Sequence, residues 1–356
     1  MPHTPLKMNN EQLVTDADIL HESMLRSATF KMSATGEVVM PCVPSMLDYY
    51  ISWLDQLFTM LGKPMPEQVK DSLYKLLENH LEVGFKAERH SELVFRYEPS
   101  EKSTFGISCS IGTRVLSIAD EYSKWVETRE PPLFGAHPDA KVMTVAAELG
   151  EPAQSRILDV GAGVGRNTMP LAKLGYPVDA LEVTPAFAEQ IRATAAAEGL
   201  PVSVIESDVF SPEVQIEGSY QLAIAAEVTS DFRGVEQLQT FLKKMSDLLN
   251  PGVSLLFNIF LAADGYEPDQ MARELSQVMI SSVFTSGELA LAMTGLPLEL
   301  ISNESVCEYE QKHLPAEAWP PISWFINWAS GRNVFPLSKE ENPPIELRWI
   351  LCHKKA

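Results

Sequence analysis

The sequence predicts an α/β protein in two parts. Residues 1–138 are expected to form a mainly helical N-terminal domain containing a β-hairpin, and residues 139–356 a doubly wound sheet with an antiparallel last strand. Three observations predict this. The length of 356 residues suits two domains better than one. After residue 150, apolar runs alternate with helical patterns, which is typical of a parallel sheet. Finally, two β-like runs end the chain with no strong helix between them.

The N-terminal domain begins with two predicted helices. Residues 44–61 carry apolar side chains at helical spacing, and Gly62 and Pro64 end the pattern. Pro66 opens the second helix, whose apolar stripe runs from Val69 to Leu81. Since neither helix carries a recognisable motif, we expect this part of the chain to serve as a cap over a site or as a dimerisation region.

A hairpin and a connector complete the first domain. The β-type runs Leu93–Tyr97 and Phe105–Ile111 flank a turn-rich segment, a pattern that predicts paired strands. A helix is expected over about 114–127. The connector 129–138 follows and is stiffened by three prolines.

The second domain repeats a strand–helix unit. Local signals mark the helices between the strands: Thr184 as N-cap and Pro185 at the first helical position open one, and Gly199 ends it. The five alternations predict parallel strands with helices on both faces of the sheet. The predicted strands are 156–160, 178–182, 202–206, 220–226 and 253–260.

The end of the chain departs from this alternation. At the start of the second domain, a helix is expected over about 139–149, ahead of the first strand. Much later, Thr285 and Glu288 form a capping-box pattern that opens a short helix. The β-like runs 298–310 and 345–353 are then expected to pair antiparallel and close the edge of the sheet.

Composition narrows the class of function. The formal net charge is −20, and no segment is rich in lysine and arginine, so nucleic acid is a poor partner. No apolar run is long enough for a membrane span, and the N-terminus lacks the apolar stretch of a secretory signal; a cytoplasmic protein is therefore expected. The four cysteines and seven histidines show no metal-ligand spacing, so neither disulfides nor a metal is expected.

The richest stretch is the glycine turn after the first predicted strand. Gly161, Gly163 and Gly165 lie between that strand and the next helix, where open α/β sheets bind ligands. The spacing is G-x-G-x-G, and Arg166 stands where the G-x-G-x-x-G pattern of dinucleotide-binding turns has its third glycine. Asp159, just before the turn, suits a cationic ligand better than a phosphate. A nucleotide-binding oxidoreductase is therefore the weaker interpretation.

Residues 157–165, Ile-Leu-Asp-Val-Gly-Ala-Gly-Val-Gly, resemble the first motif of class I S-adenosylmethionine (SAM)-dependent methyltransferases. The resemblance extends over about residues 150–260 and implies a Rossmann-like sheet with SAM as cofactor. It places Glu182 at the ribose hydroxyls, Asp208 at the adenine amino group and the Val209 N–H at the adenine ring. It also places Glu227, after the fourth strand, beside the transferable methyl group. The implied cofactor-binding residues are Asp159, Gly161, Gly163, Gly165, Asn167, Glu182, Asp208, Val209 and Glu227.

The type of acceptor is suggested by a shorter likeness. Gly165-Arg166-Asn167 is similar to the turn of tellurite-resistance and small-thiol methyltransferases, although Glu182 stands where many of those have aspartate. This favours a small-molecule acceptor. We expect methyl transfer to N or O of a metabolite, with specialised metabolism as one setting and a homodimer left open. A thiol or metalloid methyltransferase, a protein methyltransferase and a non-catalytic SAM-binding regulatory protein are the alternatives.

Candidate acceptor-site residues lie outside the cofactor motif. Tyr122 and His137 flank the connector, and Trp324 and Trp328 lie on a short predicted helix between the last two strands. Arg233 ends the polar run that begins at Glu227. Glu227 and His137 are the candidate catalytic bases, and Tyr122, Arg233, Trp324 and Trp328 are the candidate substrate-binding residues. Ordinary packing is the competing interpretation for the aromatic side chains.

Overall fold

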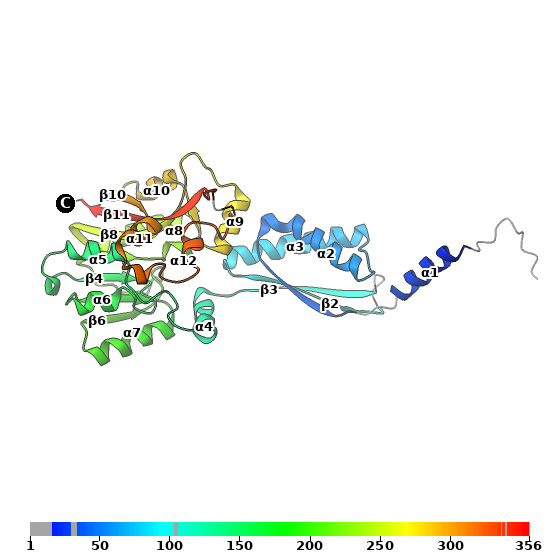
Figure 1. The fold of residues 1–356 in the computed structure, drawn as a ribbon, viewed down its shortest axis with the longest axis horizontal. Coiled ribbons are helices and arrows are strands. Elements are labelled where there is room, and N and C mark those ends of the chain that lie inside the picture. Colours follow the sequence, from blue (N-terminus) through cyan, green and yellow to red (C-terminus); the bar gives the residue numbers. More distant parts are fainter. Residues whose placement is uncertain (1–15, 30–33, 103–105, 336, 339, 356) are drawn as a thin grey trace, which may run out of the picture. The chain divides into compact units, whose positions relative to one another are not determined.

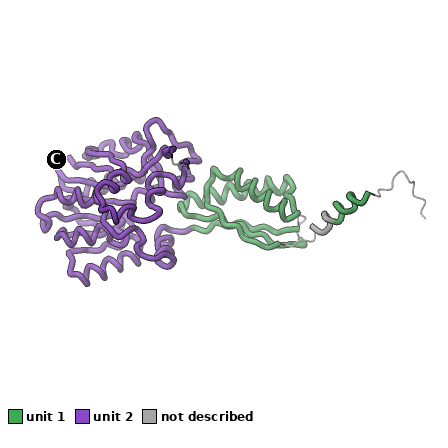
Figure 2. Tube along the Cα trace, in the orientation of Figure 1, with its two compact units in different colours: residues 1–115 green, residues 116–356 purple. Residues whose placement is uncertain are grey.

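The computed structural model describes residues 16–29, 34–102, 106–335, 337–338 and 340–355. The chain divides into two compact units, residues 1–115 and 116–356 (Figure 2). The expected fold class is confirmed: a mixed α/β protein with a mainly parallel sheet and a hairpin-containing N-terminal part. No helix among the described residues is both long and apolar enough to cross a membrane.

In the first unit, two amphipathic helices pack against an antiparallel sheet. Leu54 and Phe58 of one helix and Leu77 and Leu81 of the next are completely buried, with Phe95 of the sheet among them. This is the core that the apolar stripes predict. The elements of this unit are α1 (Ala17–Thr29), β1 (Gly36–Pro41), α2 (Leu47–Met60), α3 (Glu67–Ala87), β2 (Glu92–Pro99) and β3 (Ile107–Arg114).

The predicted hairpin of β2 and β3 is confirmed, but the sheet has a third strand. β1 pairs antiparallel with β2 over six residues, from Gly36 opposite Tyr97 to Pro41 opposite Glu92. The sequence of β1 is too short to stand out, and only its pairing with β2 makes it a strand. The start of the expected run 105–111 lies outside the described residues.

The second unit begins with two helices that precede the first strand of its sheet. The helix expected over 114–127 starts later, because Arg114 still pairs in β3 and Ser117 forms a capping box with Asp120. The helices are α4 (Ile118–Thr128), α5 (Ala140–Ala147), α6 (Thr168–Lys173), α7 (Pro185–Glu198), α8 (Val235–Leu248), α9 (Gln270–Met279), α10 (Ser286–Met293), α11 (Val306–His313) and α12 (Phe325–Ala329).

The strands of the second unit form one sheet (Figure 1). Its order is β10-β11-β8-β7-β4-β5-β6, with β9 paired to β8 off this path. Strands β6, β5, β4, β7 and β8 are parallel, and β11 is antiparallel to both of its neighbours. The strands are β4 (Ile157–Val160), β5 (Val178–Glu182), β6 (Val202–Glu206), β7 (Tyr220–Ala225), β8 (Leu249–Ala262), β9 (Val283–Phe284), β10 (Leu298–Ser305) and β11 (Ile345–Lys354).

Helices cover both faces of this sheet. On one face, Leu238 and Phe241 of α8 and Leu289 of α10 pack on the alternate strand residues that include Leu158 and Phe257. On the other face, helices α5, α6, α11 and α12 pack on a second core that includes Ile157 and Trp349. The doubly wound arrangement brings the carboxyl ends of β4, β5, β6 and β7 to one edge, where the candidate residues lie.

The strand expected over 298–310 is wrong in its second half. β10 ends at Ser305, whose side chain accepts a hydrogen bond from the Glu308 N–H and opens α11. The β-like composition of Val306–Glu310 is overridden because Val306 and Glu310 are buried on one side of a helix. Helix α11 thus lies between the last two strands, where it was not expected, whereas α12 is the short helix that the sequence predicts around Trp328.

Candidate functional site

The glycine turn between β4 and α6 is bound to the neighbouring strand. The N–H groups of Gly161 and Ala162 both donate to the Leu181 carbonyl, at 2.8 and 3.1 Å. Gly161 has φ +67°, and a Cβ atom there would lie 2.5 Å from Cγ2 of Val228. Only glycine meets both demands without strain. The turn therefore packs directly against the segment that follows β7.

Glu182 connects the end of β5 to this turn. Its Oε2 accepts a hydrogen bond from the Gly163 N–H and its Oε1 one from the Thr184 N–H, both at 2.7 Å. Burial raises the pKa of the carboxyl group, and these backbone donors oppose that rise. Each carboxylate oxygen can accept a second hydrogen bond, so Glu182 retains capacity for a ligand's hydroxyl groups.

The carboxylate of Asp159 has a hydrogen-bond partner within the protein. It is buried at the end of β4, and its Oδ2 accepts a hydrogen bond from the Thr168 hydroxyl at 2.6 Å. Burial raises its pKa to about 7, and the Thr168 hydroxyl works in the opposite direction. This contact ties the strand before the turn to the helix after it.

Asp208 and Val209 lie just beyond β6. Asp208 is exposed, and its Oδ1 accepts a hydrogen bond from the Phe210 N–H at 2.8 Å. The next residue, Val209, is buried, and its N–H donates to none of the described residues. An exposed carboxylate next to an N–H with no partner among the described residues matches the edge of an adenine ring, which presents a donor next to an acceptor.

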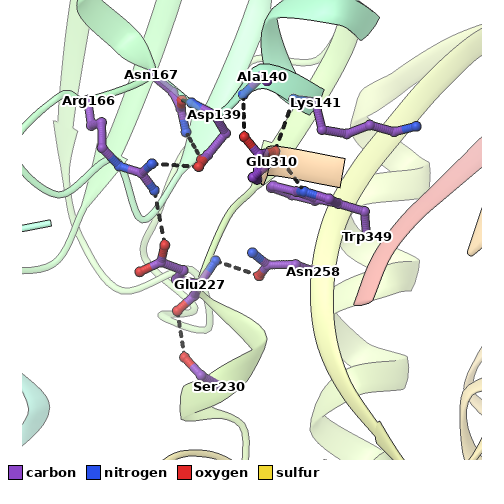
Figure 3. A network of polar contacts seen from close by, with 10 residues as sticks. All are labelled: Asp139, Ala140, Lys141, Arg166, Asn167, Glu227, Ser230, Asn258, Glu310 and Trp349. Carbon is purple, nitrogen blue, oxygen red and sulfur yellow. Dashed lines mark hydrogen bonds and ion pairs between the residues drawn. The ribbon is translucent and has the colours of Figure 1, made fainter. Parts of the chain in front are cut away.

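Glu227 adopts an unusual backbone conformation at the end of β7. Its φ is +63°, a left-handed value that residues with a side chain seldom adopt. Figure 3 shows how this conformation is held: the Glu227 N–H donates to Oδ1 of Asn258 at 2.6 Å, and its carbonyl accepts from the Ser230 hydroxyl at 2.6 Å. The surrounding contacts thus fix the main chain at this position.

The side chain of Glu227 belongs to a buried polar network (Figure 3). Its Oε1 pairs with Nη2 of Arg166 at 3.0 Å, and Nη1 of Arg166 pairs with Asp139. Asn167 donates to Oδ2 of Asp139 at 2.9 Å and accepts from its N–H at 2.9 Å. The side chain of Asn167, a predicted cofactor-binding residue, is therefore directed to Asp139.

A third carboxylate, from α11, lies beside this network. Completely buried Glu310 accepts hydrogen bonds from the N–H groups of Ala140 and Lys141 and from the Trp349 indole. It thereby caps the start of α5. Sequence reasoning missed Asp139, Arg166 and Glu310 as parts of the site. The only local signal was an arginine at the end of the glycine turn.

The connector residues form an aromatic cluster near the glycine turn. Tyr122 packs at 5.5–6.0 Å between ring centroids against Trp125, Phe134 and Phe187. The Phe134 ring lies 3.8 Å from where a Cβ of Gly163 would be. The structure therefore brings Tyr122 close to the turn through Phe134, whereas His137 on the same connector is exposed.

The remaining candidates lie on other segments. Trp328 of α12 contacts Phe260 of β8 and Trp324, and its indole N–H donates to the Ile280 carbonyl at 3.4 Å. These contacts make Trp328 part of the packed core on that face. The N–H of Arg233 donates to the Gln237 side chain at 2.6 Å, at the start of α8.

Comparison with known proteins identifies the second unit. Residues 157–252 match the sequence family described as "Methyltransferase domain". Over this segment the match confirms the expected resemblance to class I SAM-dependent methyltransferases, for which SAM is the cofactor. No curated protein shows a sequence match to the chain.

Solved structures with a similar fold include three of stated activity. Geranyl diphosphate C-methyltransferase from Streptomyces coelicolor A3(2) is 11% identical, with 66% of this chain and 97% of that chain covered and a TM-score of 0.49. The [4+2]-cyclase SpnF is 14% identical, with 61% and 82% covered and a TM-score of 0.45. The StiE O-MT, residues 961–1257, is 16% identical, with 60% and 73% covered and a TM-score of 0.41.

The residues at this edge of the sheet fit the cofactor. The backbone of the glycine turn lies close to any ligand that covers it. Among the described residues, the Phe134 ring alone lies within 4 Å of the place that a Cβ atom of Gly163 would take. Glu182 offers acceptors for hydroxyl groups, and Asp208 with Val209 offers an acceptor and a donor. When bound, SAM supplies an electrophilic methyl group on a sulfonium. The protein has to align an acceptor with that methyl, and Glu227 is the ionisable group at the adjoining strand end.

Proposed function

We propose that this protein transfers the SAM methyl group to a nitrogen or oxygen of a small-molecule metabolite. One observation carries the proposal: Glu182 and Glu227 come from two different strand ends. Glu182 accepts a hydrogen bond from Gly163 of the glycine turn, and Glu227 accepts one from Arg166, which follows that turn. Such a juxtaposition supports a ribose-binding acid and a reaction-site acid around one ligand. In this proposal SAM lies over the turn between them.

The cofactor contacts follow from this placement. Glu182 accepts hydrogen bonds from the ribose hydroxyls, which are charge-assisted and strong. Asp208 accepts one from the adenine amino group, and the Val209 N–H donates to the ring. Gly161, Gly163 and Gly165 keep the turn close to the amino-acid part of SAM, while Asp159 and Asn167 act through the hydrogen bonds that hold the turn.

The acceptor is proposed to lie beside Glu227. An acceptor that must lose a proton gives it to the carboxylate, whereas one that reacts without deprotonation needs alignment only. Tyr122, Arg233, Trp324 and Trp328 remain proposed substrate contacts, with His137 as a second candidate base. We propose further that the N-terminal region, residues 1–138, selects the acceptor as a cap or joins two chains.

Radiolabelled methyl transfer tests the proposed function. The full-length chain is incubated with methyl-labelled SAM and pools of small amines, alcohols, thiols and a protein extract, and transfer to each fraction is counted. Labelling of amine or hydroxyl compounds that falls at least tenfold in Glu227→Gln supports the proposal. Transfer only to thiols or to protein would replace it, and SAM binding without transfer to any pool would indicate a regulatory SAM-binding protein.

A further inference from the structure

The guanidinium of Arg166 joins two carboxylates that lie far apart in the sequence. Nη1 contacts Asp139, just before α5, and Nη2 contacts Glu227, just after β7. Only 9% of the Arg166 side chain and 5% of the Asp139 side chain are exposed. A buried arginine between two carboxylates has a fixed direction, because turning away would leave charges without partners.

Asp139 is itself held in place. Asn167 contacts it twice, and Asp139 is the residue before α5, whose first N–H groups are capped by Glu310. Asp139 therefore acts as a fixed point for Arg166. The position of the guanidinium is set by the helix start rather than by the glycine turn alone.

Glu227 uses only one of its oxygens in this contact. Oε1 is held by Arg166 at 3.0 Å, while no other described residue hydrogen-bonds to Oε2. The Glu227 side chain is 21% exposed, so it is not sealed from solvent, and Oε2 is the oxygen that keeps its capacity to accept from a ligand. With the main chain fixed by Asn258 and Ser230, the ion pair with Arg166 decides where the carboxylate points.

Resting on the proposed function, in which Glu227 adjoins the transferable methyl, we propose that Arg166 is a positioning residue. Anchored by Asp139, it holds Oε1 of Glu227, leaves Oε2 for the acceptor and sets the charge state of the carboxylate. As the acceptor's lone pair forms the bond to the methyl carbon, the carbon–sulfur bond breaks with its electrons passing to sulfur. The acceptor's N–H or O–H proton passes to Oε2.

The charges around Glu227 support this role. Burial raises the pKa of Glu227 to about 7; Arg166 opposes the rise, and Asp139 and Asp231 add to it. Asp139 thus orients the arginine and also repels the glutamate. Asp139→Asn keeps an oxygen that can accept from Arg166 but removes the negative charge, so it should lower the pKa of Glu227, whereas removing the charge of Arg166 should raise it.

The test is a direct titration of Glu227 that needs no acceptor. The full-length chain is labelled with ¹³C-glutamate, and the Glu227 carboxyl signal is assigned by its absence in Glu227→Gln. We expect the midpoint to fall by about one unit in Asp139→Asn and to rise by about one unit or more in Arg166→Met. Arg166→Lys should restore most of the wild-type midpoint. Arg192→Met, which removes an exposed arginine paired with Glu206, is the matched control.

Opposite shifts support the proposal, because general loosening of the fold moves both midpoints the same way. Shifts of one sign, or an unchanged midpoint in Arg166→Met, would overturn it. If Arg166→Met fails to fold, Asp139→Asn and Arg166→Lys still decide. Calorimetry with SAM and S-adenosylhomocysteine distinguishes failure of the proposed function from failure of the role of Arg166. If neither compound binds, the proposed function is wrong. If both bind normally and the titrations of Glu227 are unaltered in the variants, only the role of Arg166 is wrong.

Discussion

Replacing Glu182 with alanine removes a buried carboxylate from between β5 and the glycine turn. The N–H groups of Gly163 and Thr184, each 2.7 Å from a carboxylate oxygen, lose their acceptor. The buried Thr184 N–H left without a partner costs about 1–3 kcal/mol, and the half-buried Gly163 N–H costs less because water can reach it, so the free energy of unfolding should fall by about 1–4 kcal/mol. The ribose hydroxyls lose the same acceptor, and SAM affinity should fall by about 1–3 kcal/mol, or roughly 5- to 150-fold.

Two measurements separate these effects. Urea unfolding gives the change in stability, and calorimetry with S-adenosylhomocysteine at 25 °C gives the change in affinity of the folded variant. Glu206→Ala is the matched control, because Glu206 lies opposite Glu182 on the neighbouring strand but is exposed and pairs with Arg192. It should change neither quantity by more than about 0.5 kcal/mol.

The reasoning about this site would be refuted by a folded Glu182→Ala protein with wild-type affinity. Equal losses of affinity in Glu182→Ala and Glu206→Ala would also refute it, because they would point to a general effect of negative charge at this edge of the sheet. A loss of stability alone, with affinity intact, would leave Glu182 as a structural tie for the turn.

Three further substitutions test other parts of the site. Gly161→Ala should lower the free energy of unfolding by about 1–2 kcal/mol from its left-handed backbone alone, and by more because the new Cβ meets Val228, as measured by urea unfolding. The native Asp159 carboxyl has a pKa of about 7 and therefore holds its proton to higher pH than the unfolded one. Its contribution to the free energy of unfolding should fall as pH rises from about 4 to 7. Asp159→Asn should remove this fall, so the free energy of unfolding should change less between about pH 4 and 7 than in the wild type. Glu310→Ala leaves three N–H donors without their acceptor and should cost about 3 kcal/mol or more, whereas exposed Glu308→Ala should cost little.

Controls and contrary results for these variants are simple to state. Gly150→Ala, where a Cβ meets nothing within 4 Å, should leave stability nearly unchanged. Equal effects at Gly150 and Gly161 would contradict the steric argument. An unaltered pH dependence in Asp159→Asn would show that this carboxyl titrates normally in the native state. A tolerated Glu310→Ala would mean that water replaces the carboxylate at the start of α5.

The convergence of the glycine turn and the three acidic residues could be predicted from local sequence, because parallel strands end at a common edge of the sheet. The glycine spacing after β4 and the acids after β5, β6 and β7 are each visible within a few residues. Once alternation with helices predicts a parallel sheet, those strand ends must converge. Helix boundaries with strong caps, such as Thr285 with Glu288 and Gly199, were predictable for the same local reason.

The tertiary structure alone decided the contacts that join distant segments. β1 exists because β2 offers it a partner, and 306–310 is helical because its buried side must meet the sheet and cap α5. The pairing of Arg166 with Asp139 and Glu227 bridges separations of 27 and 61 residues, and no local pattern signals it. Sequence alone thus predicted the edge of the sheet where we propose that a methyl donor binds, because that edge depends on strand ends. The orientation of Glu227 depends on buried charges meeting across the fold, and those are placed only when the chain packs.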